Sequence, residues 1–177
     1  MPPVLIVPGL HNSGPDHWQS RWHRQHPHWQ RVTGQRWQEP DLAAWSEQVA
    51  SWLRANTEPV HIVAHSFGTL ASLLAAQRYP QRVASLFLVA PADPALLGID
   101  ETQLTMPAPV PGVVIGSRND PWMSLSRLQH WQHIWGLPLH DAGLAGHLNT
   151  DSGHGDWPEG LDWLSELWQR LPTVQVA

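Results

Sequence analysis

The chain has 177 residues, of which 42% are hydrophobic and 14% are charged, and its formal net charge is −5. These values predict a single globular domain, residues 1–177, with a sizeable core, and they exclude an intrinsically disordered chain. All ten basic residues are arginines, and they are scattered rather than clustered into the basic stripe of a nucleic-acid-binding surface. No nucleic-acid partner is therefore expected.

The chain contains no cysteine, which excludes disulfides, thiolate zinc sites and cysteine nucleophiles. The first residues, MPPVLIVPG, lack the basic and long apolar segments of a secretory signal peptide. No apolar run approaches the roughly 18 residues of a membrane span. We therefore expect a cytoplasmic protein that does not bind a membrane.

The composition is unusual in its twelve tryptophans and twelve histidines. The tryptophans favour core packing over a carbohydrate-stacking surface, because each one buries a large apolar area. Four histidines fall close together, at positions 17, 23, 26 and 28. The six-residue step from His17 to His23 does not place them on one helical face. We therefore expect partly exposed polar side chains and no metal site.

Predicted strands and helices alternate along the chain. In order, the first half predicts a strand at 4–7, a helix at 14–26, a weaker strand at 31–37, a helix from Pro40-Asp41 to Leu53, a strand at 60–64 and a helix at 67–79. The second half predicts a strand at 83–90, a proline-rich loop at 91–109, a strand at 112–117, a helix at 124–135, a short strand at 138–143 and a helix at 158–171. This alternation predicts a mainly parallel sheet with helices on both faces, a three-layer α/β/α arrangement.

Reactive side chains follow several of the predicted strands. Ser66, Asp120 and His147 each come shortly after a different strand. Because active groups gather at the carboxyl ends of parallel strands, these three side chains are expected to meet at one edge of the sheet. Their order along the chain, Ser, Asp, His, is that of α/β hydrolases.

The segment HIVAHSFGTL (61–70) resembles a nucleophile elbow, the strand-turn-helix motif Gly-x-Ser-x-Gly. Ala64 replaces the first glycine, whereas Gly68 keeps the last one. The motif needs small side chains at both places because strand and helix approach closely around a sharp turn. Alanine adds a single methyl group, so the segment remains compatible with an elbow. A serine in this place can also simply cap the helix.

The three residues suggest a chemical hypothesis. A serine hydroxyl becomes nucleophilic when a neighbouring base removes its proton, and His147 is the expected base. Asp120 would orient the imidazole and stabilise its charged form. Ser66 would lie at a helix N-terminus, which favours negative charge. The backbone N–H groups of Leu10 and Phe67 are the expected oxyanion donors.

Other residues compete for two of these roles. His154 is the alternative base, whereas His65 is expected to point away from the cleft. Asp93, which follows the strand after the nucleophile helix, is the alternative acid. Asp141 is expected to be structural, and the segment RNDP (118–121) also has the composition of a plain turn.

Four segments are similar to the small α/β serine hydrolases related to retinoblastoma-binding protein nine, the YdeN-like group: PGLHNSGPDHWQSRW, VAHSFG, SRNDPWMS and AGHLNTDSGHGDWPEG. The similarity runs from about residue 4 to about residue 170. It implies a minimal α/β-hydrolase fold with little lid and a triad of Ser66, Asp120 and His147, since the family's histidine follows the glycine of a GH pair. Members are treated as esterases or peptidase-like hydrolases of poorly defined substrate. The retinoblastoma-protein partner is not implied, because its binding motif is not recognisable here.

These observations predict hydrolysis of small carboxylic esters, or of amides, through an acyl-serine intermediate and without a cofactor. His11, Asn12, Trp122 and Trp157 are the candidate pocket residues, and the segment 91–111 is expected to shape the entrance of an open pocket. One alternative is a binding protein that keeps the fold without the chemistry. Another is a metal-assisted hydrolase that uses the histidines. No protein partner and no acyl preference are predicted.

Overall fold

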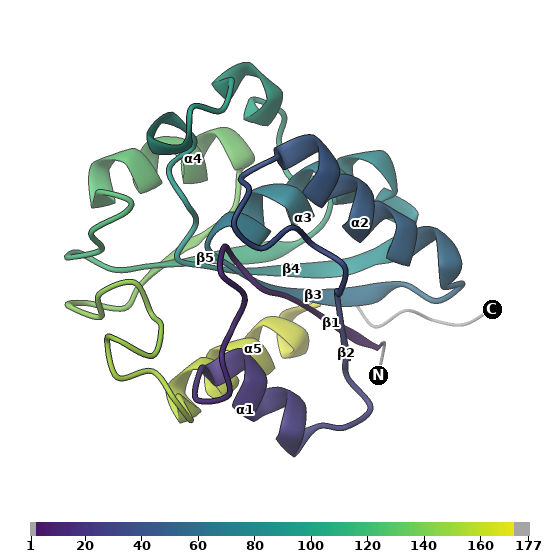
Figure 1. Cartoon of the computed structure of the whole chain (residues 1–177), viewed down its shortest axis with the longest axis horizontal. Helices are drawn as coiled ribbons and strands as arrows, with labels where there is room; N and C mark the ends of the chain where they lie inside the picture. Colours follow the sequence, from purple (N-terminus) through teal and green to yellow (C-terminus); the bar gives the residue numbers. More distant parts are fainter. Residues whose placement is uncertain (1–2, 172–177) are drawn as a thin grey trace.

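The computed structural model describes residues 3–171, which form a six-stranded sheet in the order β2-β1-β3-β4-β5-β6 (Figure 1). Every neighbouring pair of strands is parallel. The strands are β1 (Val4–Val7), β2 (Gln30–Arg31), β3 (Val60–His65), β4 (Val83–Val89), β5 (Gly112–Gly116) and β6 (Leu139–Asp141). The expected domain also includes residues 1–2 and 172–177, which lie outside the described residues.

Five α-helices cover the two faces of the sheet within residues 3–171. One face carries α1 (Trp18–Gln25) and α5 (Pro158–Arg170). The other carries α2 (Leu42–Ala55), α3 (Phe67–Arg78) and α4 (Leu125–Trp135), as Figure 1 shows. This is the predicted three-layer arrangement. Among the helices of residues 3–171, none combines the length and the apolarity needed to cross a bilayer.

The strand order places a topological switch between β1 and β3. The chain leaves β1 toward β2 on one side and then returns to build β3 and the remaining strands on the other side. In open parallel sheets, ligands bind outside the carboxyl ends of the strands at such a switch. The residues that follow β1 and β3, among them Leu10 and Ser66, are therefore the ones placed to form a site.

Several predicted elements differ from the structure. Helix α1 starts at Trp18 rather than at residue 14, because His17 is its N-cap and its Nδ1 accepts the N–H of Gln19 at 3.2 Å. Strand β2 has two residues instead of the seven at 31–37, since Gly34, at φ +81°, takes the chain out of the extended conformation. The loop at 91–109 contains two short 3₁₀-helices, η2 (Pro94–Leu97) and η3 (Glu101–Leu104). A third, η1 (Pro80–Arg82), precedes β4.

The core consists of one apolar cluster on each face of the sheet. Strands β1 and β3 are buried along their whole length, which explains their apolar sequences. The buried tryptophans, which confirm the prediction of core packing, are Trp18, Trp22, Trp29, Trp45, Trp131, Trp135 and Trp157. On the α1 and α5 face, Trp157 stacks on Trp22 at 5.6 Å between ring centroids and meets Trp18 edge-on at 5.0 Å.

Three histidines are buried in these layers, and burial lowers the pKa of each. The pKa of His17 falls to about 3, mainly through burial and further through the charge of Arg31. The pKa of His61, which contacts the Ser85 hydroxyl at 2.7 Å, falls to about 4. Burial also holds the pKa of His65 well below its ordinary value of 6.5. All three side chains are therefore neutral in the folded protein near neutral pH.

The buried histidines predict that stability decreases with acidification between pH 7 and pH 5. In the unfolded chain these histidines bind protons as the pH falls through about 6.5, whereas in the folded protein they stay neutral. The free energy of unfolding should therefore decrease as the pH decreases. Its slope should be at most roughly 4 kcal/mol per pH unit for three such groups. Urea unfolding at a series of pH values measures this slope. His61→Gln should reduce it by about a third, its share among three such groups, and exchange of the exposed His28 for Gln should not. An unfolding free energy that is constant over this range would contradict the burial of neutral histidines.

Candidate active site

Ser66 occupies a strained turn between β3 and α3. Its backbone has φ 53° and ψ −125°, a combination that side-chain-bearing residues rarely adopt. The turn is held because the Ser66 N–H donates to Val89 O at 2.9 Å, while Thr69 N–H and Oγ1 both donate to Ser66 O. The Ser66 side chain makes no capping bond to α3, although it sits at the N-cap position. Its hydroxyl is thus not used as a helix cap.

Gly68 allows the first turn of α3 to pass directly over the end of β1. A Cβ at this position would meet the carbonyl oxygen of Pro8 and would lie 2.6 Å from that of Val7. Gly9 is equally confined, since a Cβ there would lie 2.8 Å from Ser66 Cβ. Ala64, which pairs with Val7 in the sheet, is fully buried in its place. The close approach falls on the helix side of Ser66, where the sequence keeps its glycine.

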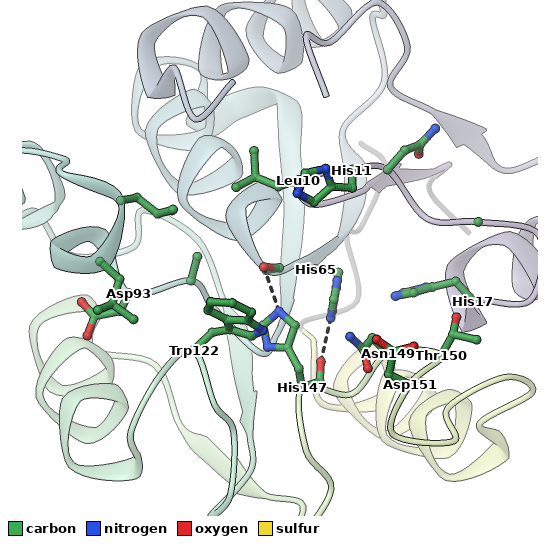
Figure 2. Close-up of a pocket in the computed structure, with 16 residues that line it drawn as sticks. Leu10, His11, His17, His65, Asp93, Trp122, His147, Asn149, Thr150 and Asp151 are labelled. Carbon is green, nitrogen blue, oxygen red and sulfur yellow. Dashed lines mark hydrogen bonds between the residues drawn. The ribbon is translucent and has the colours of Figure 1, made fainter. Parts of the chain in front are cut away.

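The imidazole of His147 bridges Ser66 and Asp120. Its Nδ1–H donates to the Asp120 carboxylate, at 2.9 Å to Oδ2 and 3.0 Å to Oδ1. Its Nε2 accepts from the Ser66 hydroxyl at 3.0 Å (Figure 2). The two side chains are shielded from water, with 10% of His147 and 3% of Asp120 exposed. The carboxylate also accepts the N–H of Trp122 at 2.9 Å, which fixes its orientation.

The loop that carries His147 is tied to the end of β5. Asn119 Oδ1 accepts the Gly146 N–H at 2.8 Å and the Ser117 hydroxyl at 2.8 Å. Ser117 Oγ in turn accepts the N–H of Ala145 at 3.0 Å. These bonds join the turn before Asp120 to the residues just before His147, so the separation of the carboxylate and the imidazole is set by the backbone.

His65 holds the same loop from the opposite side. Its Nε2–H donates to the carbonyl oxygen of His147 at 2.9 Å, and its ring lies 4.8 Å from that of His17. His65 was expected to point away from the cleft, but it borders the cleft while remaining 95% buried. His17 was expected to be partly exposed and is also 95% buried. Both expectations were wrong because α1 and the His147 loop cover these rings.

A cleft of about 560 Å³ opens beside Ser66 (Figure 2). Of the four candidate pocket residues, His11, Asn12 and Trp122 line it. Trp157 does not line it, which corrects the prediction. Its indole is 94% buried because it fills the space between α1 and the sheet against Trp18.

Leu10 and Phe67 supply backbone N–H groups near Ser66. No acceptor among residues 3–171 receives a hydrogen bond from either N–H. Leu10 lies at the cleft wall after β1, and Phe67 is the first residue of α3. Two unpaired backbone donors beside a serine hydroxyl are the feature that an oxyanion site requires.

The competing residues are engaged elsewhere. His154 Nδ1 contacts the Ser152 hydroxyl at 2.9 Å. The Asp93 carboxylate accepts two hydrogen bonds from Arg127, and these bonds lower the pKa of that carboxyl. Asp141 accepts from the guanidinium of Arg118 at 2.7 Å, in agreement with a structural role. Neither His154 nor Asp93 hydrogen-bonds to Ser66 or His147 in the described part of the chain.

The histidines do not gather into a metal-binding cluster over residues 3–171, where no three His, Asp or Glu side chains are arranged to hold an ion. His26 instead stacks on Trp29, with ring centroids 4.4 Å apart. His23 Nε2 contacts the carbonyl oxygen of Trp29 at 3.0 Å. These side chains stabilise the connection between α1 and β2.

Comparison with known proteins relates the chain to hydrolases. Residues 4–166 match the family model for serine hydrolases. No curated protein matches the chain. Among solved structures, a candidate YdeN-like hydrolase of Pectobacterium atrosepticum is 40% identical, with a TM-score of 0.90 over 96% of this chain and 92% of that one.

Two more distant structures share the fold. The ydeN gene product of B. subtilis is 20% identical, with a TM-score of 0.76 over 96% of this chain and all of that one. A candidate hydrolase of the alpha/beta superfamily from Xanthomonas campestris is 17% identical, with a TM-score of 0.67 over 97% of this chain and all of that one. The architecture is therefore the α/β-hydrolase fold, and the chain belongs to the serine hydrolase family.

Proposed function

We propose that this protein hydrolyses small carboxylic esters through an acyl-serine intermediate, with Ser66 as nucleophile, His147 as acid and base, and Asp120 as the group that orients His147. The continuous contact from Asp120 through His147 to Ser66 Oγ is the observation that supports this proposal most directly. It has the donor and acceptor order that the reaction needs, because the Nδ1–H points to the carboxylate and the Nε2 lone pair to the hydroxyl.

In the first half of the reaction, Ser66 Oγ attacks the carbonyl carbon of the ester while its proton passes to His147 Nε2. The carbonyl oxygen becomes an oxyanion that accepts the N–H groups of Leu10 and Phe67. When the tetrahedral intermediate collapses, the bond to the alcohol oxygen breaks. That oxygen takes the proton from His147, and the acyl group stays on Ser66.

In the second half, a water molecule gives a proton to His147 Nε2 and its oxygen attacks the acyl carbon. Collapse of this second intermediate returns the proton to Ser66 Oγ and releases the carboxylic acid. The Asp120 carboxylate remains ionised throughout and stabilises the imidazolium that forms twice in each cycle. The shielding of Asp120 and His147 from water strengthens this interaction.

Ser66→Ala tests the nucleophile. The variant should lose labelling by a fluorophosphonate probe, and its kcat for p-nitrophenyl butyrate should fall on the order of 10⁶-fold, as for a nucleophile variant of subtilisin. Gel fluorescence measures the labelling and absorbance measures the kcat. Ser126→Ala, which removes a serine of α4, should keep both. Full labelling of Ser66→Ala would contradict the assignment, and tight binding of the ester without turnover by the wild type would favour a binding protein.

A second pair of variants tests the acid. Asp120→Asn should lower kcat by roughly 10⁴-fold, as in the trypsin triad, because an amide cannot hold the imidazole in the required tautomer. Asp93→Asn is the matched control, since this carboxylate also borders the cleft but pairs with Arg127. Asp93→Asn should lower the melting temperature, whereas its loss of kcat should be much smaller than that of Asp120→Asn. Steady-state kinetics and thermal melts of both variants give the comparison, and the opposite order of kcat losses would identify Asp93 as the acid.

A further inference from the structure

The cleft has two chemically different halves on either side of His147. Figure 2 shows Trp122 and Asp93 on one side, and His17, Asn149, Thr150 and Asp151 on the other. Ala92, Leu96 and Leu97, which flank or follow Asp93 in the chain, add apolar side chains to the lining of the cleft. The other side is lined by amide, hydroxyl, imidazole and carboxylate groups.

The apolar half exposes two large apolar side chains at the cleft. Leu96 is 64% exposed and Trp122 is 58% exposed, and both border the cleft. Asp93 adds no free charge here, because Arg127 neutralises it with two hydrogen bonds. An apolar ligand group that covers these side chains removes their surface from water, which favours its binding.

The polar half carries a negative charge without a counter-ion. Asp151 is exposed at the cleft and forms no ion pair within the described part of the chain. None of the arginines, all of which lie within residues 3–171, lines the cleft, and the chain contains no lysine. His17 and His65, two of the buried histidines that border the cleft, are neutral because burial lowers their pKa values. An anionic ligand group would thus meet the Asp151 carboxylate, and no arginine side chain lines the cleft to pair with it.

The chemistry of the reaction indicates which half of the cleft binds the acyl group of an ester and which half binds its alcohol. His147 Nε2 protonates the departing alcohol and later deprotonates the incoming water, so both oxygens occupy the same place at different times. That place must admit water. The hydrogen-bonding half, built by the residues that follow His147, offers polar side chains to both oxygens, whereas the leucines of the other half offer none.

We infer that the substrate is an ester of an apolar carboxylic acid with a polar alcohol that is uncharged or cationic, the acyl group lying against Leu96 and Trp122 and the alcohol lying beside Asn149, Thr150 and Asp151. This inference rests on the proposed function. Asp151 selects against anionic alcohols, since it repels them at short range and favours a cation in the same position.

Three hexanoyl esters with matched alcohols test the charge preference: hexanoylcholine, the uncharged isostere 3,3-dimethylbutyl hexanoate and the hexanoyl ester of 3-hydroxypropanoate. The value of kcat/KM should fall in that order, by about fivefold at each step, which is the effect of roughly 1 kcal/mol between unit charges about 4 Å apart in water. Asp151→Asn should bring the three values together. Asp162→Asn, which removes an exposed carboxylate of α5, should leave the order unchanged.

The acyl preference has its own test. Leu96→Ala should lower the ratio of kcat/KM for hexanoylcholine over acetylcholine by roughly fivefold, through the loss of apolar contact. Met106→Ala is the matched control, because Met106 is also a large exposed apolar side chain, at 61%, and does not line the cleft. The inference is overturned if Leu96→Ala acts no more strongly than Met106→Ala, or if the wild type hydrolyses the three hexanoyl esters equally at Ser66. Failure to hydrolyse any ester would instead overturn the proposed function and this inference with it.

Discussion

The contact between Gly68 and the end of β1 is the constraint on which the site depends. Because position 68 has no Cβ, α3 begins against the carbonyl groups of Val7 and Pro8. This contact brings the turn at Ser66 beside the residues that follow β1, so a hydroxyl from one strand end lies near a backbone N–H from another. The strained φ of Ser66 is tolerated because hydrogen bonds to Val89 and Thr69 fix the turn on both sides.

The position of His147 depends on a second set of contacts, which come from three directions. Asn119 accepts the N–H of Gly146, the residue before His147, and His65 donates to the carbonyl of His147. Trp18 Nε1–H donates to the carbonyl of Leu148 at 2.8 Å. His65 can hold the loop without placing a second positive charge beside the imidazole because burial keeps its pKa well below 6.5. The helix that follows β1 and the residue before Ser66 therefore both help to position the imidazole.

The succession of strands along the chain and the meeting of Ser66, Asp120 and His147 could be predicted from the sequence, since apolar runs mark buried strands and parallel strands end at one edge. The places of His17, His65 and Trp157 could not. Each depends on how α1 packs on the loop after β6, a contact between segments more than 80 residues apart. The hydrogen bond from the Trp18 indole to the Leu148 carbonyl joins two residues that are far apart in the sequence, and no local periodicity reveals it. His17 and Trp18 lie in the segment PGLHNSGPDHWQSRW, which resembles the YdeN-like group, but that segment alone does not indicate their burial.

The asymmetry of the cleft follows from how its two walls are built. The wall after β6 is an irregular loop, whose backbone groups need polar partners, and Asn149 provides them by accepting from the Ser152 N–H at 3.2 Å. The wall after β4 begins with η2, whose N-cap Asp93 is paired with Arg127 and whose leucines remain for contact with ligand. The polar side chains that satisfy the loop after β6 thus make that wall hydrogen-bonding, whereas the pairing of Asp93 with Arg127 leaves the other wall apolar. Because His147 lies between them, the scissile bond of an ester would have unlike surroundings on its two sides, which is a basis for selecting both its acid and its alcohol.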